Sequence, residues 1–565
     1  MLVYGDRSRT RAPRAMLREL AQALSGAEAT DGHERDDRLT GALIVAGELA
    51  QGLADAEFEA AGYDHRSPTQ DAAMALSVAV ARQLLTGAPA ARPEIEALAD
   101  MPLPAAIRCK SPEGYAFYAV YPQSYFAAAR SCRWDSPPLV IGLRSIGASL
   151  AAAVAAATGG RAISLRPRGD PFAREVRVSP ALAAELRAHG GPFAIVDEGP
   201  GLSGSSFGAA ADLLEGLGVA PRRTVFLPSH ANGPGPQASV RHRLLLASAE
   251  RAVRTFEDLT RDHPLPDWFA DLIGPVRRVE DLCAGAWRRL RPLHAWPPVA
   301  ASQERRKYRL ITDDGAYLAR FAGLGDIGAG KLSRARLLAA GGFVPEPLAL
   351  RRGFILERWV SGAPLDGAEA RRARFLANLA RYLGFRARRL PAGPEAGATL
   401  EELIEMTACN AGELWGEDCA AAIRERLAGL PRLARLAREL RRVYVDGRLQ
   451  PWEWLRRADG TFCKTDALDH AEAHDLVGCQ DIAWDIAGAA VEFGLSPQQT
   501  QELATEVAGL AGRAIHPDAV AAFQLCYAAL QAGAWSFAEG GADACERRRI
   551  VTRRDLYAAR LKPPV

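Results

Sequence analysis

The sequence has few of the features that mark disulfide scaffolds and zinc sites. Its 565 residues include nine cysteines, an odd number, and no two of them form a Cys-x-x-Cys pair. This pattern supports neither a disulfide framework nor a tetrahedral zinc site, so we interpret the cysteines as thiols of a reducing compartment. The ten histidines include no His-Glu-x-x-His pair, so the sequence does not indicate a metalloprotease.

Long apolar runs are missing as well. Residues 1–16 lack the apolar segment of a signal peptide. The most apolar stretch, residues 139–160, contains Arg144 and is interrupted by glycines, so it is unsuited to a membrane span. We therefore expect a soluble protein of the cytoplasm that makes no contact with a membrane.

The chain also lacks a strong excess of either charge. It has 70 Lys and Arg against 67 Asp and Glu, a formal net charge of +3. Nucleic-acid binding by bulk charge needs a larger cationic excess, so this class is not predicted, and the arginine-rich stretches 371–389 and 432–442 are interpreted as solvated helix faces. Hydrophobic residues make up 48% and charged residues 24%, which are ordinary globular values. We expect a folded protein that acts on small molecules.

Four regions are indicated by the pattern along the chain. Residues 1–104 are predicted to form a helical N-terminal region, because Ala- and Leu-rich stretches begin at positions such as Ser67-Pro68, a helix cap followed by proline. It contains no catalytic pattern, and we expect it to cap the protein or to form a homo-oligomer surface. Residues 246–302 are predicted to be a helical connector.

The two larger regions differ in fold class. Residues 105–245 alternate short apolar runs with helical segments, which predicts an α/β region with a parallel sheet. The expected strands are 115–121, 138–143, 161–165, 193–196 and 224–228. Residues 303–565 open with a predicted hairpin around Asp313-Asp314-Gly315 and continue as helices, which predicts a second, α+β region.

One motif in the α/β region suits a sugar phosphate. Asp197 and Glu198 follow an apolar strand, and a loop of Gly and Ser, residues 199–206, leads into a helix. Glycines allow close backbone approach, serine hydroxyls donate hydrogen bonds, and amides at a helix start face an anion. Two adjacent acids suit the hydroxyls of a ribose or a Mg²⁺ ion reached through water. The simpler alternative is that the acids only cap a helix.

This motif resembles that of the type I phosphoribosyltransferase family, in which an apolar strand, two acids and a Thr-Gly-x-Thr helix start bind phosphoribosyl pyrophosphate. The resemblance implies that Asp197 and Glu198 are the catalytic acids, holding the ribose and, through water, Mg²⁺. It implies that the phosphate is bound by Gly201, Ser203, Gly204, Ser205 and Ser206. The spacer, residues 199–202, is one residue longer than the family's usual pattern.

A second match lies upstream in the expected order. Residues 140–150 resemble the family's first strand, pyrophosphate loop and following helix, and residues 166–177 fall where the family has a mobile hood. The pyrophosphate ligands implied are Gly142, Arg144, Ser145, Gly147 and, from an entry segment, Lys110. The implied reaction transfers the phosphoribosyl group to a nitrogen nucleophile and releases pyrophosphate, as in nucleotide metabolism; the acceptor is not identified.

The C-terminal region resembles the aminoglycoside-phosphotransferase branch of the kinase-like fold. The hairpin, the segment 353–365 and the segment 481–487 correspond in order to an N-lobe hairpin, an interlobe hinge and a buried C-lobe helix. The family's His-Gly-Asp-x-x-x-x-Asn loop falls on residues 446–453.

The residues at the family's reactive positions are changed. Arg448 stands in the place of the catalytic acid, Glu453 in that of the metal-binding amide, and Arg320 in that of the strand lysine. Only Asp466 keeps a metal-binding acid. Because an arginine does not accept a proton, we predict a degenerate domain without conventional kinase chemistry.

Residues 325–332 nearly spell a phosphate-binding P-loop, but Leu332 replaces the hydroxyl residue that ligates Mg²⁺. We expect a mobile loop here, with phosphate contact by Lys331 as a further option.

The sequence thus predicts an enzyme, a phosphoribosyltransferase that uses Mg²⁺. Two alternatives stay open. One is a regulatory protein that senses nucleotides without turnover, and the other is a phosphotransferase in which Glu453 and Asp466 hold the metal. Pyrophosphate release and ATP consumption distinguish the three.

Overall fold

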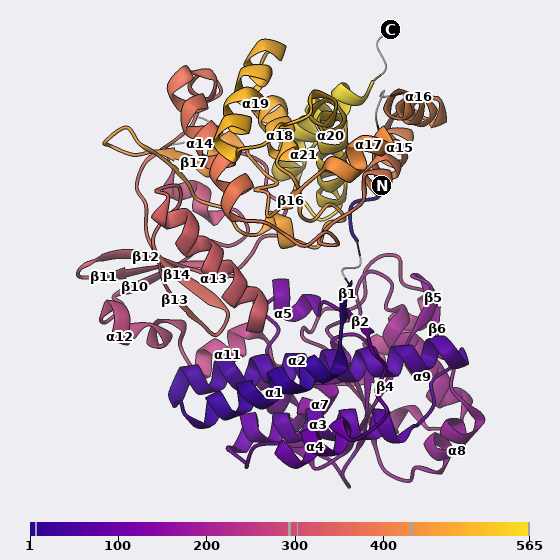
Figure 1. Cartoon of the computed structure of the whole chain (residues 1–565). Helices are drawn as coiled ribbons and strands as arrows, with labels where there is room; N and C mark the ends of the chain where they lie inside the picture. Colours follow the sequence, from indigo (N-terminus) through magenta and orange to yellow (C-terminus); the bar gives the residue numbers. More distant parts are fainter. Residues whose placement is uncertain (6–7, 292–294, 302, 430–432, 563–565) are drawn as a thin grey trace.

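The computed structural model describes the chain except residues 6–7, 292–294, 302, 430–432 and 563–565. It is a mixed structure of helices and strands. Its two large sheets, one parallel and one antiparallel, have five strands each. Figure 1 shows the N-terminal half as the lower body, the C-terminal helices as the upper body, and the antiparallel sheet beside the junction of the two. None of the described helices is long and apolar enough to cross a membrane.

The parallel sheet lies in the N-terminal half. Its strand order is β4-β3-β7-β8-β9, and every neighbouring pair is parallel. The strands are β3 (Leu139–Leu143), β4 (Arg161–Leu165), β7 (Phe193–Val196), β8 (Thr224–Leu227) and β9 (Glu250–Arg251). Four of the five expected strands are therefore confirmed. The connections between them contain α7 (Gly147–Thr158), α8 (Pro180–Ala188), α9 (Ser205–Gly216) and α10 (Val240–Ser248).

The fifth expected strand, 115–121, is wrong. This segment forms α5 (Glu113–Phe117), a short helix that begins after Pro112 and has Glu113 in its first turn. Tyr115 and Phe117 are buried in it. A short run of aromatic residues has no periodicity that distinguishes a strand from one helical turn, so tertiary packing decides the outcome.

The N-terminal helices are part of the same body as the parallel sheet. They are α1 (Pro13–Glu28), α2 (Gly32–Ala61), α3 (Pro68–Thr86) and α4 (Arg92–Ala99). Both α2 and α3 contact α7, and a Cβ at Gly47 of α2 would lie 2.5 Å from the Ser149 Cβ, so the backbones approach closely. Strand β1 (Ser8–Arg11) pairs with β2 (Ile107–Lys110) across the expected boundary at 104. A cap placed this tightly shares its core with the sheet.

The antiparallel sheet has the order β10-β11-β12-β14-β13. Its strands are β10 (Arg278–Asp281), β11 (Lys307–Thr312), β12 (Gly315–Phe321), β13 (Pro347–Arg351) and β14 (Phe354–Arg358), and α13 (Gly325–Ala340) joins β12 to β13. The predicted hairpin is confirmed as β11 and β12. The predicted helical connector also contains strands. It supplies an edge strand to each large sheet, β9 to the parallel sheet and β10 to the antiparallel sheet.

Helices dominate the rest of the C-terminal half, as expected. They are α14 (Ala373–Arg389), α15 (Leu400–Trp415), α16 (Glu417–Ala428), α17 (Leu433–Glu439), α18 (Ala483–Phe493), α19 (Pro497–Ala511), α20 (Pro517–Glu539) and α21 (Ala544–Ala558). Short strands β15 (Ala363–Pro364), β17 (Trp454–Arg456) and β18 (Phe462–Lys464) form a small sheet, and β16 (Arg442–Val443) pairs with β19 (Gln480–Asp481). The remaining elements are α6 (Pro122–Ser131), α11 (Phe256–Asp262), α12 (Ala270–Ile273) and the hairpin β5 (Arg168–Asp170) with β6 (Ala173–Glu175).

One apolar core joins the N-terminal half to the antiparallel sheet. Leu310, Phe321 and Phe354 of that sheet lie in the same buried cluster as residues of α2, α3 and α7. The Phe354 ring stacks on Phe256 of α11, with 5.7 Å between centroids. The expected boundary at 303 therefore runs through a packed region.

Candidate functional site

The two motifs predicted in the α/β region meet at one edge of the parallel sheet. Strands β3 and β7 are parallel neighbours with Gly142 opposite Val196, so the loop after β3 lies beside Asp197 and Glu198 after β7. A Cβ at Gly147 would lie 2.8 Å from the Val196 carbonyl oxygen, which shows how tightly the loops are packed. In open parallel sheets ligands bind at this carboxyl edge.

Burial changes the chemistry of the two acids. It raises the pKa of Asp197 to about 7, although the carboxylate accepts a hydrogen bond from the Glu198 amide. Burial, together with the nearby Glu113 and Asp197 charges, raises the pKa of Glu198 to about 8. A cation bound between the two carboxyl groups would lower both values.

The serine hydroxyls of the next loop are turned toward the β5–β6 hairpin. Ser203 Oγ and Ser205 Oγ each donate to the Pro171 carbonyl oxygen, at 2.7 Å, and Arg174 Nη1 donates to Ser206 Oγ at 3.3 Å. Gly204 has a φ of 64° just before α9, a conformation that favours glycine. The hairpin at the position of the expected hood thus contacts the predicted phosphate loop, and in this structure the two hydroxyls donate to the hairpin.

Arg144 requires a correction. Its guanidinium is buried and faces N-terminal acids: Nε lies 3.0 Å from Asp55 Oδ1, Nη2 is paired with Asp64, and Nη1 donates to Ser164. A buried guanidinium needs such partners, so Arg144 fixes the helical region to the sheet and its donors are not turned to a pyrophosphate. Lys110 lies at the end of β2, where it pairs with Ser8 of β1. Gly142, Ser145 and Gly147 remain at the loop.

A cavity of about 220 Å³ lies in the C-terminal half and is also lined by other parts of the chain. Polar lining residues include Arg305, Arg320, Arg448, Asp466, Asp469 and His470. Near the N-terminus Tyr4 lines the cavity, with its ring 5.0 Å from that of His474. The connector residues Leu282, Trp287, Arg291 and Pro298 line another wall.

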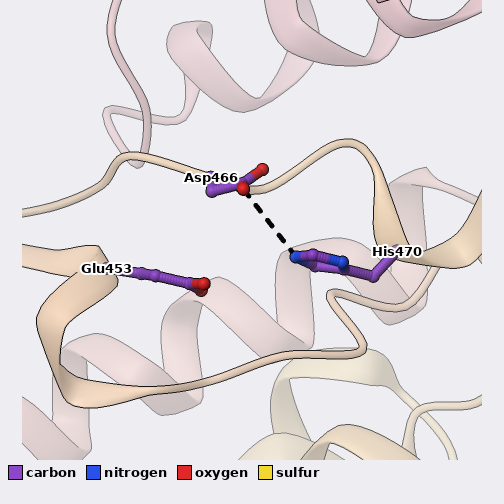
Figure 2. Close-up of side chains that lie close together, drawn as sticks. All are labelled: Glu453, Asp466 and His470. Atoms are coloured by element: carbon purple, nitrogen blue, oxygen red, sulfur yellow. Dashed lines mark ion pairs between the residues drawn. The ribbon is translucent and has the colours of Figure 1, made fainter. Parts of the chain in front are cut away.

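Three ligand-type side chains converge in this cavity. Atoms of Glu453, Asp466 and His470 lie within 4.8 Å of one another, as Figure 2 shows. The pairing of β17 with β18 brings Glu453 to Asp466, and Thr465 donates its amide hydrogen to the Glu453 carbonyl oxygen at 2.9 Å. His470 follows Asp466 by four residues, with Nε2 3.9 Å from Asp466 Oδ2. Asp466 Oδ1 and His470 Nε2 are buried and have no hydrogen-bond partner among the described residues.

Burial shifts the pKa of the carboxyl groups and the pKa of the imidazole in opposite directions. Burial raises the pKa of Glu453 to about 8, against the opposing charge of Lys464, whose Nζ lies 2.7 Å from Glu453 Oε2. Burial and the Arg448 charge lower the pKa of His470 to about 3. Burial acts to raise the pKa of Asp466, but the surrounding cations hold it below its usual value. His470 is therefore neutral near pH 7 and presents a lone pair.

The predicted P-loop segment is also corrected. Gly325 to Leu332 form the first turns of α13 instead of a mobile loop, and Lys331 is fully buried. Its ammonium group pairs with Asp469, which also accepts from Arg320 Nη1 at 2.9 Å. Burial would raise the pKa of Asp469, yet these cations hold it well below its usual value. Lys331 serves this ion cluster and is not placed for phosphate contact.

Hydrogen bonds to α18 fix the backbone of the loop that carries Arg448. Asp485 of α18 accepts hydrogen bonds from the amides of Asp446 and Gly447, at 2.8 and 2.9 Å. Asp446 also receives the Tyr382 hydroxyl and lies 3.3 Å from Lys464 Nζ. Arg448 thus lines the cavity from a fixed backbone.

Sequence reasoning found Arg320, Glu453 and Asp466 at this cavity but missed His470, Asp469 and Lys464. The Asp466–His470 spacing of four was no reliable signal, because residues 466–469 lie outside any helix and the rule that pairs such positions applies to helices. Nothing local marked Lys464, whose partners lie on separate segments of the chain.

Helix α5 lies between the two sites. A Cβ at Gly114 would lie 2.9 Å from Glu198 Oε2, so this turn contacts the parallel-sheet acids. The preceding residue, Glu113, pairs through Oε1 with His474 Nε2 at 2.9 Å, and His474 lines the C-terminal cavity.

Comparison with known proteins gives structures only. No family model and no curated protein sequence matches the chain. The choline kinase LicA from Streptococcus pneumoniae is 16% identical with a TM-score of 0.34, and the match covers 53% of this chain and 99% of that one. A macrolide 2'-phosphotransferase from Brachybacterium faecium is 18% identical with a TM-score of 0.32, covering 55% and 98%.

A third neighbour, an aminoglycoside 2'-phosphotransferase, is 14% identical with a TM-score of 0.34, covering 54% and 98%. All three are kinases or phosphotransferases by name, and none is a phosphoribosyltransferase. At TM-scores this low the likeness carries no argument, so a function for this chain has to rest on its own side chains.

Proposed function

We propose that the C-terminal cavity binds a phosphate ester with a divalent cation and that the protein is a phosphotransferase. The observation that carries this proposal is the convergence of Glu453, Asp466 and His470 in a 220 Å³ cavity that is also lined by Arg320 and Arg448. Carboxylates beside guanidinium groups suit a metal–phosphate ligand, because each half of that ligand has partners of opposite charge.

The residues present fit a divalent cation. The cluster supplies two carboxylates and one imidazole, and two of its buried polar atoms have no other partner among the described residues. Glu453 and Asp466 would hold the ion, which neutralises charge on phosphate oxygens when bound.

The cationic side chains have distinct roles in this proposal. Arg320 is fixed by Asp469 at 2.9 Å and by Glu357 at 3.7 Å, so it presents its charge from a rigid position. Arg448 offers a guanidinium where the resembled family has an acid, and it would bind phosphate oxygens instead of accepting a proton. Phosphoryl transfer depends mainly on positioning and charge neutralisation, which these groups supply.

The test is ATP consumption by the full chain with Mg²⁺ or Mn²⁺ and a panel of sugars, nucleosides and amino alcohols as acceptors. Asp466→Asn should lower the rate at least about 10–100-fold, the range caused by loss of an outer-shell metal partner alone. Glu506→Gln, at an exposed position of α19, is the control and should behave as wild type. No phosphorylated product with any acceptor, or equal rates in the two variants, would reject the proposal.

A second candidate is phosphoribosyl transfer at the edge of the parallel sheet. The specific observation in its favour is that Asp197, Glu198 and the Gly142–Gly147 loop lie side by side, next to the start of α9. Calorimetry with phosphoribosyl pyrophosphate and Mg²⁺ should show binding that weakens in the Asp197→Asn, Glu198→Gln double variant. Affinity that does not change in a folded double variant rejects this assignment.

A further inference from the structure

We propose that His470 makes the C-terminal cluster a site for Zn²⁺, a first-row cation that binds imidazole, in preference to Mg²⁺. The inference deepens the phosphotransferase proposal, since it concerns the same cavity. It does not require turnover, because metal binding is measured without nucleotide.

The geometry assigns a ligand role to the imidazole. The side chain of His470 is 10% exposed, and its Nε2 is buried without a hydrogen-bond partner among the described residues. A buried polar nitrogen left unpaired is costly, so its orientation toward Asp466 and Glu453 calls for a ligand. Figure 2 shows the imidazole ring and the two carboxylates turned toward one another.

The surrounding charges do not exclude a cation. Lys464 is neutralised by Asp446 and Glu453, at 3.3 and 2.7 Å. Arg320 lies 4.0 Å from Asp466 but is bound more closely by Asp469, at 2.9 Å. Arg448 faces the same cavity, where a phosphate would satisfy it. Lys464 and Arg320 thus have closer acid partners, and Asp466 Oδ1 has no hydrogen-bond partner among the described residues.

The donor set determines the preference. Mg²⁺ binds oxygen ligands and retains several waters, whereas imidazole nitrogen favours Zn²⁺ and its neighbours in the first transition row. The cluster offers one nitrogen and two carboxylates within 4.8 Å of one another, which matches an ion that binds imidazole, such as Zn²⁺.

The experiment uses the full chain, with Mn²⁺ binding followed by electron paramagnetic resonance. Zn²⁺ should displace Mn²⁺ at far lower concentration than Mg²⁺ does. His470→Gln should weaken Zn²⁺ binding, read from the displacement of Mn²⁺, by about 10–100-fold and change Mg²⁺ binding little. His474→Gln is the matched control, because His474 lines the same cavity but pairs with Glu113 outside the cluster.

Two outcomes overturn the inference: equal competition by Mg²⁺ and Zn²⁺, or unchanged Zn²⁺ affinity in folded His470→Gln. Should that variant not fold, X-ray absorption of the Zn²⁺-loaded wild type decides. Imidazole scattering with oxygen ligands supports the site, and sulfur ligands or the lack of imidazole scattering reject it. Metal binding with this preference but no phosphotransfer would leave the site standing while the proposed activity falls.

Discussion

The acids at the parallel-sheet edge and Asp469 in the C-terminal cavity have opposite surroundings. Burial raises the pKa of Asp197 and of Glu198. Their carboxylates accept hydrogen bonds from backbone amides, and no described cation pairs closely with them. In the C-terminal cavity Asp469 is held by two buried cations, Arg320 and Lys331. At the sheet edge no described cation forms an ion pair with the two acids. In the second arrangement the buried charges form ion pairs with one another.

The largest effect should come from breaking that network. Asp469→Asn leaves Arg320 and Lys331 buried without their shared acid, which should lower the free energy of unfolding by about 3–5 kcal/mol. Urea unfolding measures it. Asp313→Asn removes an exposed pair with Arg277 and is the control, which should leave the unfolding midpoint unchanged. Equal midpoints for the two variants would show that the network is not a stabilising feature.

A somewhat smaller loss is expected where the helical region is fixed to the sheet. Asp64→Asn removes one partner of Arg144, but Asp55 remains 3.0 Å away, so we expect about 3 kcal/mol, the low end for a broken buried pair. The same unfolding assay applies. Arg144→Ala should also destabilise the fold, and a stable Arg144→Ala protein with selective loss of phosphoribosyl pyrophosphate binding would restore the pyrophosphate role that the sequence predicts for this residue.

Release of the β5–β6 hairpin should cost less. Ser203→Ala with Ser205→Ala removes both hydrogen bonds to Pro171, each worth about 1 kcal/mol. Amide exchange in residues 168–175 should accelerate by one to two orders of magnitude, a range of about 1.4–2.7 kcal/mol. Ser248→Ala, on exposed α10, is the control. Unchanged exchange in the hairpin would mean that other contacts hold it closed.

The last effect is measured as a slope, the pH dependence of stability, and not as a loss in a single variant. Because folding raises the pKa of Asp197 to about 7 and of Glu198 to about 8, the folded state binds more protons than the unfolded state. Their contribution is fully present below about pH 4, the unfolded values, and is lost as pH rises to about 8. The Asp197→Asn, Glu198→Gln variant should therefore lose less stability than wild type between pH 5 and about 8. Parallel curves would mean that the two acids titrate normally.

Much of the parallel-sheet edge was predictable from sequence, because parallel strands place their carboxyl ends together whatever the packing around them. The loops after β3 and β7 are neighbours for that reason. The role of Arg144 was not predictable, since its acids lie about eighty or more residues upstream in a region with no motif of its own. The sequence predicted an anion-binding loop here, but it did not reveal the carboxylates that pair with Arg144.

The C-terminal cavity shows the same limit. Arg320, Glu453 and Asp466 were identified because they occupy positions of a known pattern. Lys331 was misjudged because its Gly-rich surroundings suggested a loop, whereas α13 forms and buries it against Asp469. Pairing between residues more than a hundred positions apart is a property of the folded chain and leaves no local trace.

The apolar core shared by α2, α7 and the antiparallel sheet has a practical consequence for dissecting the protein. A cut at residue 303 would remove β10 from its sheet and expose the side chains of Leu310, Phe321 and Phe354 to water. Such a fragment would expose an apolar face and an unpaired strand edge, and both features promote aggregation. The chain should melt in one step that includes both halves, and expression of either half alone should give insoluble material.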